Sequence, residues 1–250
     1  MIPPSRSSKT GVAMGDGQHS VAAAIRKILP PTIRFAGGSL AGAQIALFPA
    51  EEDLVRASAA KRIAHFTAGR CYARRALRQI DMNPVAILAD HSRMPIWPAG
   101  AVGSISHCDA FCGVAVARRE SVRAIGFDVE DSGPLGSDLA ATVCAGDELA
   151  HAANGSPLGE GDAAKLLFVI KESFYKAYAP ATREFLEFQD VRATIDWTKH
   201  RFRIALVNSR KPDLFGKRSL VGRFGRKSGT AFAISTVFVG DDADASEAGA

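Results

Sequence analysis

The sequence predicts an α/β (α+β) protein in which two helix-plus-sheet blocks follow one another along the chain. Its 250 residues fit one large domain or two small ones. Apolar residues make up 47% of the chain and charged residues 23%, close to the average of globular proteins. Two long helical patterns each have short β-like segments nearby. No run of 18 apolar residues occurs, so we expect a soluble protein without a membrane-spanning helix.

The first block is predicted to hold two short strands and one long helix. We expect a loose tail over residues 1–20 and strands at 32–35 and 43–48. The acidic residues Glu51 and Glu52, shortly after Pro49, suit the first turn of a helix. Apolar side chains recur at helical spacing over residues 59–79, with arginines between them, which predicts an amphipathic helix.

The rest of the chain is predicted to contain more short strands around two helices. Helices are expected at 137–153 and at 163–178, the second stopped by Pro180. A joint in 115–123 would separate the two blocks. The domain prediction is therefore a tail (1–20), subdomains at 21–117 and 118–240, and an acidic tail (241–250). The predicted strands are 86–88, 103–107, 113–117, 124–130, 190–196, 201–207, 218–224 and 230–239.

Charge and cysteine content limit the kinds of partner and location. The net charge is +5, and leaving out the four carboxylates of residues 241–250 raises it to +9. A basic body favours a partner with phosphates or carboxylates: nucleic acid, an anionic membrane, a phosphorylated small molecule or an acidic protein. Four cysteines are too sparse for a disulfide framework, and no secretory pattern opens the chain. We therefore expect a reducing, cytoplasmic location.

Two carboxylates end the strand predicted at 124–130. Asp128 and Glu130 point to the same side, because successive strand side chains alternate. Paired carboxylates repel unless a cation lies between them or water solvates both. Oxygen ligands of this kind suit Mg²⁺. The alternative is an ordinary exposed strand end.

A second charged cluster lies within the helix predicted at 163–178. Glu172 and Lys176 share one face of it at i, i+4 spacing, which by itself indicates an ordinary surface ion pair. The surrounding residues are apolar almost all round, so this helix is expected to be largely buried. Charges in such a place, including Lys171, need partners or ligands.

The segment Ser104-Ile-Ser-His107 ends another short strand and leaves three possibilities. Ser106 and His107 would allow a Ser/His hydrolase, but no Gly-x-Ser-x-Gly motif accompanies them. Zinc binding by His107, Cys108 and Cys112 matches no usual spacing and lacks a fourth ligand. The third possibility is an anion contact, in which the histidine and the hydroxyl hold a phosphate.

The arginine-rich helix at 59–79 favours either a solvated face or an anion-binding face. As a nucleic-acid-binding element it lacks interleaved exposed aromatic residues, and no common nucleic-acid-binding motif accompanies it. No Walker A or Gly-x-Gly-x-x-Gly loop occurs, so side chains would have to hold any phosphate. A non-catalytic nucleotide or RNA binder using this helix remains the alternative to an enzyme.

Taken in order, the motifs resemble those of the 4′-phosphopantetheinyl transferases, most closely the monomeric class that serves siderophore, non-ribosomal peptide or polyketide synthases and includes the enterobactin synthase component. The likeness covers roughly residues 40–235. The segments that carry it are Leu47-Phe-Pro-Ala-Glu-Glu52, Lys61-Arg62-x-x-x-Phe66-x-x-Gly69-Arg70, Trp97-Pro98, Gly103-Ser-Ile-Ser-His107, Ile125-Gly-Phe-Asp128-Val-Glu130 and Phe168-x-x-Lys171-Glu172-Ser173-x-x-Lys176-Ala177.

The resemblance implies a fold and a reaction. The fold has two similar α/β subdomains related by pseudo-twofold symmetry, with the active-site cleft between them. A carrier-protein serine attacks coenzyme A, phosphopantetheine is transferred and adenosine 3′,5′-bisphosphate leaves. The resemblance implies a cytoplasmic monomer that needs Mg²⁺ and coenzyme A and acts on acidic acyl or peptidyl carrier proteins, without nucleic acid and without stable membrane association.

The resemblance also assigns roles to single residues. Three carboxylates, one of them Glu172, would hold Mg²⁺. Glu172 would also take the serine proton, with Glu148 as the lower-ranked candidate for that role. Lys176 would stabilise the leaving charge. Metal ligands are expected at Asp128, Glu130 and Glu172, and coenzyme A contacts at Arg62, Arg70, Arg93, Ser106, His107, Lys171 and Lys176.

Overall fold

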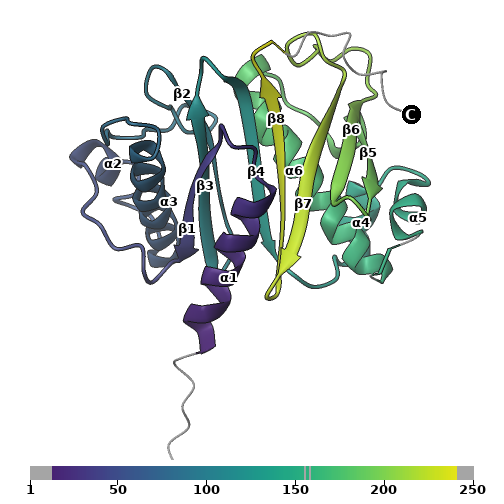
Figure 1. The fold of residues 1–250 in the computed structure, drawn as a ribbon, viewed down its shortest axis with the longest axis horizontal. Helices are drawn as coiled ribbons and strands as arrows, with labels where there is room; N and C mark the ends of the chain where they lie inside the picture. Colours follow the sequence, from purple (N-terminus) through teal and green to yellow (C-terminus); the bar gives the residue numbers. More distant parts are fainter. Residues whose placement is uncertain (1–12, 155, 158, 241–250) are drawn as a thin grey trace, which may run out of the picture.

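Two antiparallel sheets lie edge to edge at the centre of the computed structural model, which describes residues 13–154, 156–157 and 159–240 (Figure 1). The first has three strands in the order β1-β3-β2, and the second has five in the order β4-β8-β7-β6-β5. The strands are β1 (Arg34–Ser39), β2 (Ala101–His107), β3 (Phe111–Arg118), β4 (Val122–Asp131), β5 (Val191–Asp196), β6 (Arg201–Leu206), β7 (Ser219–Lys227) and β8 (Thr230–Phe238).

Each sheet carries a long helix, and one further helix lies on the opposite side of both (Figure 1). α3 packs against the three-stranded sheet, and α6, with α4 and α5, packs against the five-stranded sheet. Val21, Ala22 and Ile25 of α1 share one buried cluster with Phe35 of the first sheet and Phe232 of the second. The helices are α1 (Ala13–Ile28), α2 (Pro49–Asp53), α3 (Ala60–Arg78), α4 (Ser137–Val143), α5 (Glu148–Ala153) and α6 (Glu160–Thr182), with a 3₁₀ turn at Phe188–Asp190.

The α+β class is confirmed, while two short predicted strands are wrong. Residues 43–48 and 86–88 form no strand. Side chains take their backbone hydrogen bonds instead: the buried Glu51 carboxylate accepts from the N–H groups of Phe48 and Ile87, while Arg70 donates to the Ile87 carbonyl. Several of their polar backbone groups thus bond to side chains and not to a neighbouring strand.

The helices differ from the prediction at three places. α1 was not predicted from the sequence, and its first residues contradict the predicted tail, while residues 1–12 and 241–250 lie outside the described part. The predicted helix at 137–153 is two helices, broken where Cys144 is extended and Gly146 is left-handed. α6 continues past Pro180 to Thr182 because a proline in the last turn removes only one hydrogen bond. No helix in the described ranges has the length and apolar character needed to span a bilayer.

Candidate active site

Serine hydroxyls join the two sheets where β2 runs beside β4. The Phe127 N–H donates to Ser104 Oγ at 3.0 Å, and the Val129 N–H donates to Ser106 Oγ at 3.3 Å. Both serines are buried. These bonds take the place of a backbone ladder, so the carboxylate-bearing end of β4 is held against the histidine-bearing end of β2.

Asp128 lies at the centre of this joint and is only 2% exposed. Its Oδ1 accepts hydrogen bonds from Ser106 Oγ at 2.8 Å and from Lys176 Nζ at 2.5 Å. Its Oδ2 is buried and has no hydrogen-bond partner. Buried polar atoms are nearly always satisfied, so an unpartnered carboxylate oxygen indicates a place for a cation or a donor from a ligand.

Two further carboxylates face the charge of Asp128. Burial raises the pKa of the half-buried Glu172, and repulsion by Asp128 raises it further. Burial also raises the pKa of Glu130, again with a contribution from Asp128. Each glutamate therefore feels the negative charge of Asp128, which opposes its ionisation until a cation or a proton arrives.

The chemistry of this donor set fits Mg²⁺, which prefers carboxylate oxygens. The fit rests on the unpartnered Asp128 oxygen and the mutual repulsion around it. In the described parts of the chain no three His, Cys, Asp or Glu side chains are already arranged around a common metal position. The ammonium of Lys176 supplies the positive charge next to Asp128.

Gly126 allows α6 to approach β4 closely enough to bring these groups together. A Cβ atom at this position would lie 1.7 Å from the Ser173 carbonyl oxygen and 2.7 Å from the Ala177 nitrogen. The glycine belongs to the motif that carries the family resemblance, but its packing role cannot be read from local periodicity.

We expect Gly126→Ala to lower the free energy of unfolding by about 3 kcal/mol, because the added methyl forces α6 away from β4. Urea denaturation would measure this. Gly136→Ala is the matched control, since a Cβ there would meet nothing within 4 Å. Equal stability of the two variants would show that α6 does not depend on this close approach.

A basic pocket of about 150 Å³ lies on the α3 side of the joint. Arg62, Arg70, Arg93 and His107, all predicted to bind coenzyme A, line it together. Sequence reasoning missed His65, whose ring lies against His107 with a centroid distance of 4.3 Å. The sequence signal that could have identified it is its position on the basic helix, one turn before Gly69. The pocket combines several cationic or hydrogen-bonding groups, which suits a phosphate.

Burial lowers the pKa of His107 to about 4, helped by the charges of His65, Lys176 and Arg62. At neutral pH the imidazole is therefore uncharged. In the unfolded chain it titrates near pH 6.5. Between pH 6.5 and 4 the unfolded state consequently binds more protons, so this residue makes the fold less stable as the pH falls through that window.

We expect His107→Gln to reduce the stability lost between pH 7 and pH 5 by on the order of 1 kcal/mol, after discounting for solvent screening. Urea unfolding at both pH values would measure the difference from the parent protein. The exposed His151→Gln serves as the control. An unchanged acid loss in His107→Gln would contradict the lowered pKa.

Two less polar pockets lie on either side of the α6 face that carries Glu172 and Lys176. One, of about 220 Å³, is lined by Arg93, Met94, Pro95, Trp97, Gly103, Ser104, Ile105, Tyr175, Lys176, Ala179 and Pro180. The other, of about 250 Å³, is lined by Lys171, Glu172, Tyr175, Phe185, Leu186, Glu187, Phe188 and Val191. Tyr175 borders both, although the sequence motif did not single it out.

Lys171 and Glu148 are placed differently from the prediction. Lys171 Nζ is buried and donates to Glu148 Oε2 at 2.7 Å and to the carbonyls of Val143 and Phe188. Its three donors are thus used, and the other Glu148 oxygen accepts from the Ala193 N–H. Both charges are satisfied inside the protein. Neither a coenzyme A contact for Lys171 nor a proton-accepting role for Glu148 agrees with this placement.

Ser106 is also committed to protein contacts. Besides its bonds to Asp128 and Val129, its Oγ accepts from Lys176 Nζ at 2.9 Å. It positions the charged pair and has no free bond for coenzyme A, which corrects its predicted role. The hydrolase alternative fails for the same reason: Ser106 bonds to Asp128 and Lys176, whereas the His107 ring lies against His65.

The structure does not support the two remaining alternatives, a zinc site and an RNA-binding helix. The geometry gives no support to zinc binding, because His107, Cys108 and Cys112 do not form a group of metal ligands among the described residues. The basic helix presents no continuous arginine surface for RNA. Arg70 is buried over the Phe66 ring, and Arg74 pairs with the buried Glu51.

Comparison with known proteins gives matches over most of the chain. Residues 50–117 match the family described as 4′-phosphopantetheinyl transferase N-terminal domain, and residues 124–223 match the 4′-phosphopantetheinyl transferase superfamily. The chain is 34% identical to 4′-phosphopantetheinyl transferase Svp of Streptomyces mobaraensis over 80% of its own length and 82% of that protein.

Two other relatives match over a shorter part. Identity to 4′-phosphopantetheinyl transferase PptT of Mycobacterium tuberculosis is 36%, over 59% of this chain and 65% of that protein. Identity to enterobactin synthase component D of Salmonella typhi is 38%, over 51% of this chain and 53% of that protein.

Proposed function

Because the chain belongs to the 4′-phosphopantetheinyl transferase superfamily, we propose that it moves the 4′-phosphopantetheine group of coenzyme A to a serine of an apo carrier protein, with Mg²⁺. The single observation that carries the metal-dependent form of the reaction is the buried Asp128 carboxylate. One of its oxygens contacts Lys176, and the other has no partner.

The proposed domain organisation has subdomains at 21–117 and 118–240, related by pseudo-twofold symmetry, with the active site between them. Two features support it. Each half contains an antiparallel sheet with one long helix, α3 or α6, packed on it. The pocket of about 220 Å³ has walls from both halves, with Arg93 on one side and Lys176 on the other.

Asp128, Glu130 and Glu172 are the proposed Mg²⁺ ligands. The support for them is that burial, and then the nearby charge of Asp128, raise the pKa of both Glu130 and Glu172. When bound, Mg²⁺ neutralises charge on the pyrophosphate of coenzyme A and fixes its position. The chain itself contributes the buried Asp128, and the two partly buried glutamates would have to move toward it to share one ion.

The basic pocket is the proposed site for the nucleotide of coenzyme A, and its 3′-phosphate in particular. Arg62, Arg70, Arg93 and His107 surround it, and their donors match phosphate oxygens. The less polar pocket next to it, on the other side of Arg93, leaves room for the remaining part of the ligand along α6.

At the reacting end the carrier serine Oγ attacks the β-phosphorus of coenzyme A. The bond from that phosphorus to the bridging oxygen breaks, and adenosine 3′,5′-bisphosphate carries the released electron pair away. Glu172 is the proposed acceptor of the serine proton, because its partly buried carboxylate lies one helical turn before Lys176 on α6. Lys176, beside Asp128, stabilises negative charge on the phosphate oxygens.

An acidic carrier protein is the proposed second substrate. The +9 charge of the body without residues 241–250 supports this, because opposite charge steers association. Relatives named as enterobactin synthase components support siderophore, peptide or polyketide synthesis as the setting. We also propose that the protein is a monomer, since both walls of the pocket come from one chain. The proposed location is the cytoplasm.

Mass spectrometry of a panel of apo carrier proteins tests this function. Each carrier is incubated with the purified protein, coenzyme A and Mg²⁺. We expect one phosphopantetheine to be added at a single serine of at least one carrier, and EDTA to stop the addition. Absence of the mass gain in every carrier would refute the activity, and full activity in EDTA would refute the metal requirement.

A further inference from the structure

A tight hairpin connects the two pockets that are proposed to hold coenzyme A. Residues 88–96 turn back on themselves, with Ala89 bridged to Pro95 and the Ile96 N–H bonded to the Leu88 carbonyl at 3.0 Å. The Asp90 side chain holds the turn from inside. Its Oδ1 accepts from the N–H groups of Ser92 at 2.9 Å and Met94 at 3.0 Å.

Arg93 projects from the strained part of this hairpin. Its φ is +63°, a left-handed conformation that costs a residue with a side chain about 1–3 kcal/mol and persists only where its surroundings enforce it. The Arg93 N–H bonds to the Asp90 carbonyl at 2.9 Å, so the turn organised by Asp90 enforces this conformation. Arg93 lines both the basic pocket and the less polar pocket beside it.

The second oxygen of Asp90 is tied to the other half of the molecule. Asp90 Oδ2 accepts from Arg183 Nη1 at 2.5 Å, and the two side chains are 13% and 64% exposed. Arg183 is the C-cap of α6, with a left-handed φ of +62°. Of the ion pairs between described residues, this one alone joins 21–117 to 118–240.

We propose that Asp90 and Arg183 are positioning residues that hold the hairpin against the end of α6 and so direct Arg93 at the nucleotide of coenzyme A. The helix at one end of this ion pair also carries Glu172 and Lys176. The pair therefore ties the hairpin to the C-terminal end of this helix and acts on coenzyme A only through Arg93. This inference rests on the proposed function, because it assumes that coenzyme A occupies these pockets.

An exposed ion pair by itself contributes little, about 0.2–1 kcal/mol. Here the ion pair stabilises a strained hairpin. Arg93 is the only charged residue of that hairpin that lines the two pockets. Losing the pair is expected to weaken the affinity for coenzyme A and for adenosine 3′,5′-bisphosphate about threefold to fivefold. The turnover number at saturating coenzyme A should stay unchanged, because neither residue touches the reacting atoms.

Calorimetric titration with coenzyme A and with adenosine 3′,5′-bisphosphate tests the inference on the full chain. The two variants are Arg183→Gln, which removes the charge, and Asp90→Asn, which keeps an oxygen for the turn. We expect the same loss of affinity in both, and no further loss in the double variant, because each change breaks the same pair. Arg183→Lys should recover most of the affinity.

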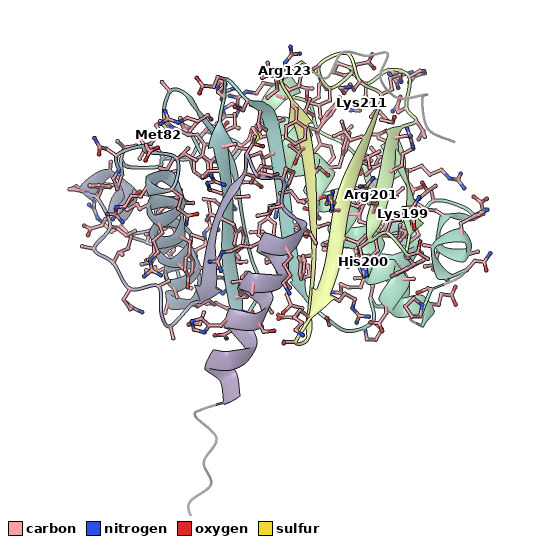
Figure 2. The ribbon with its side chains drawn as sticks, in the orientation of Figure 1. Met82, Arg123, Lys199, His200, Arg201 and Lys211 are labelled. Atoms are coloured by element: carbon pink, nitrogen blue, oxygen red, sulfur yellow. The ribbon has the colours of Figure 1, made fainter. Side chains whose placement is uncertain are left out.

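Arg201→Ala is the matched control. Arg201 is exposed on the five-stranded sheet, away from α3, and makes no ion pair within the described residues (Figure 2). The affinity of this variant for both ligands should equal that of the parent protein.

The KM for coenzyme A should rise in the Asp90 and Arg183 variants without a change in kcat.

The possible failures are distinguishable. If the parent protein binds neither ligand, the proposed function itself is wrong. If the parent binds and the pair variants bind equally well, or their effects add in the double variant, the positioning role is overturned. A fall in kcat with unchanged affinity would also overturn it.

Discussion

Replacing Asp128 by asparagine is expected to lower the rate of phosphopantetheine transfer on the order of 10²–10³-fold, the size of effect seen when a pre-positioned charge-stabilising group is lost. The amide keeps the shape of the side chain and its bond to Ser106. It removes the negative charge that holds Lys176 and the unpartnered oxygen that is proposed to hold Mg²⁺. Single-turnover transfer to an apo carrier, followed by mass spectrometry, measures the loss.

The matched control is Asp131→Asn, three residues further along β4. Asp131 Oδ2 accepts a hydrogen bond from the exposed Asp109 N–H, and Asp131 is not one of the proposed metal ligands. Its rate should stay near that of the parent protein. Calorimetric titration with Mg²⁺ in the presence of coenzyme A provides a second readout. Full transfer activity in Asp128→Asn would remove the metal assignment and leave the carboxylate a purely structural role.

Replacing Lys171 by methionine is expected to lower the free energy of unfolding by about 3–5 kcal/mol, because Glu148 keeps its charge in a buried site without a counterion. The double variant Lys171→Met/Glu148→Gln should be less destabilised than Lys171→Met alone. Urea denaturation of the two variants and the parent measures both effects.

Lys199→Met, at an exposed lysine outside the core, provides the comparison and should change stability by less than about 0.5 kcal/mol. Coenzyme A binding separates the two possible roles of Lys171. If Lys171 is structural, the folded fraction of Lys171→Met binds coenzyme A as tightly as the parent does. A large loss of affinity in folded protein of normal stability would restore Lys171 to the ligand site.

Local pattern was sufficient for several elements. The long helical spacing at 59–79 and 163–178 predicted α3 and the core of α6, because an amphipathic or apolar period depends on neighbouring residues alone. Strand alternation placed Asp128 and Glu130 on one side of β4 for the same reason. The strands of the C-terminal sheet were predicted nearly in full.

Partners distant in sequence decided what local pattern could not. Residues 43–48 and 86–88 look like strands, but Glu51, Arg70 and Arg74 satisfy their backbone groups. Such bonds join residues 3 to 36 positions apart and leave no periodic trace. Nothing local indicated that Arg183 would reach Asp90, 93 positions away.

The contrast between Lys171 and Glu172 shows this division most clearly. They are neighbours in one motif, and the sequence placed both in the active site. Neighbouring helical residues point about 100° apart. One therefore turns inward to Glu148, and the other faces Asp128. Because α6 is apolar on nearly every side, only the packing of α4 and α5 against it decides which direction is the interior.

The sequence by itself determined the two long helices α3 and α6 and the strands of the C-terminal sheet, the kind of chemistry that two carboxylates and a lysine can perform, and the resemblance that joins them. These depend on residue type and near-neighbour spacing. The tertiary structure alone decided that Ser106, Lys171 and Glu148 are structural and that Asp128 has an unpartnered oxygen beside Lys176. Whether a charged group serves the fold or the ligand depends on which distant groups satisfy it, and that is a property of packing.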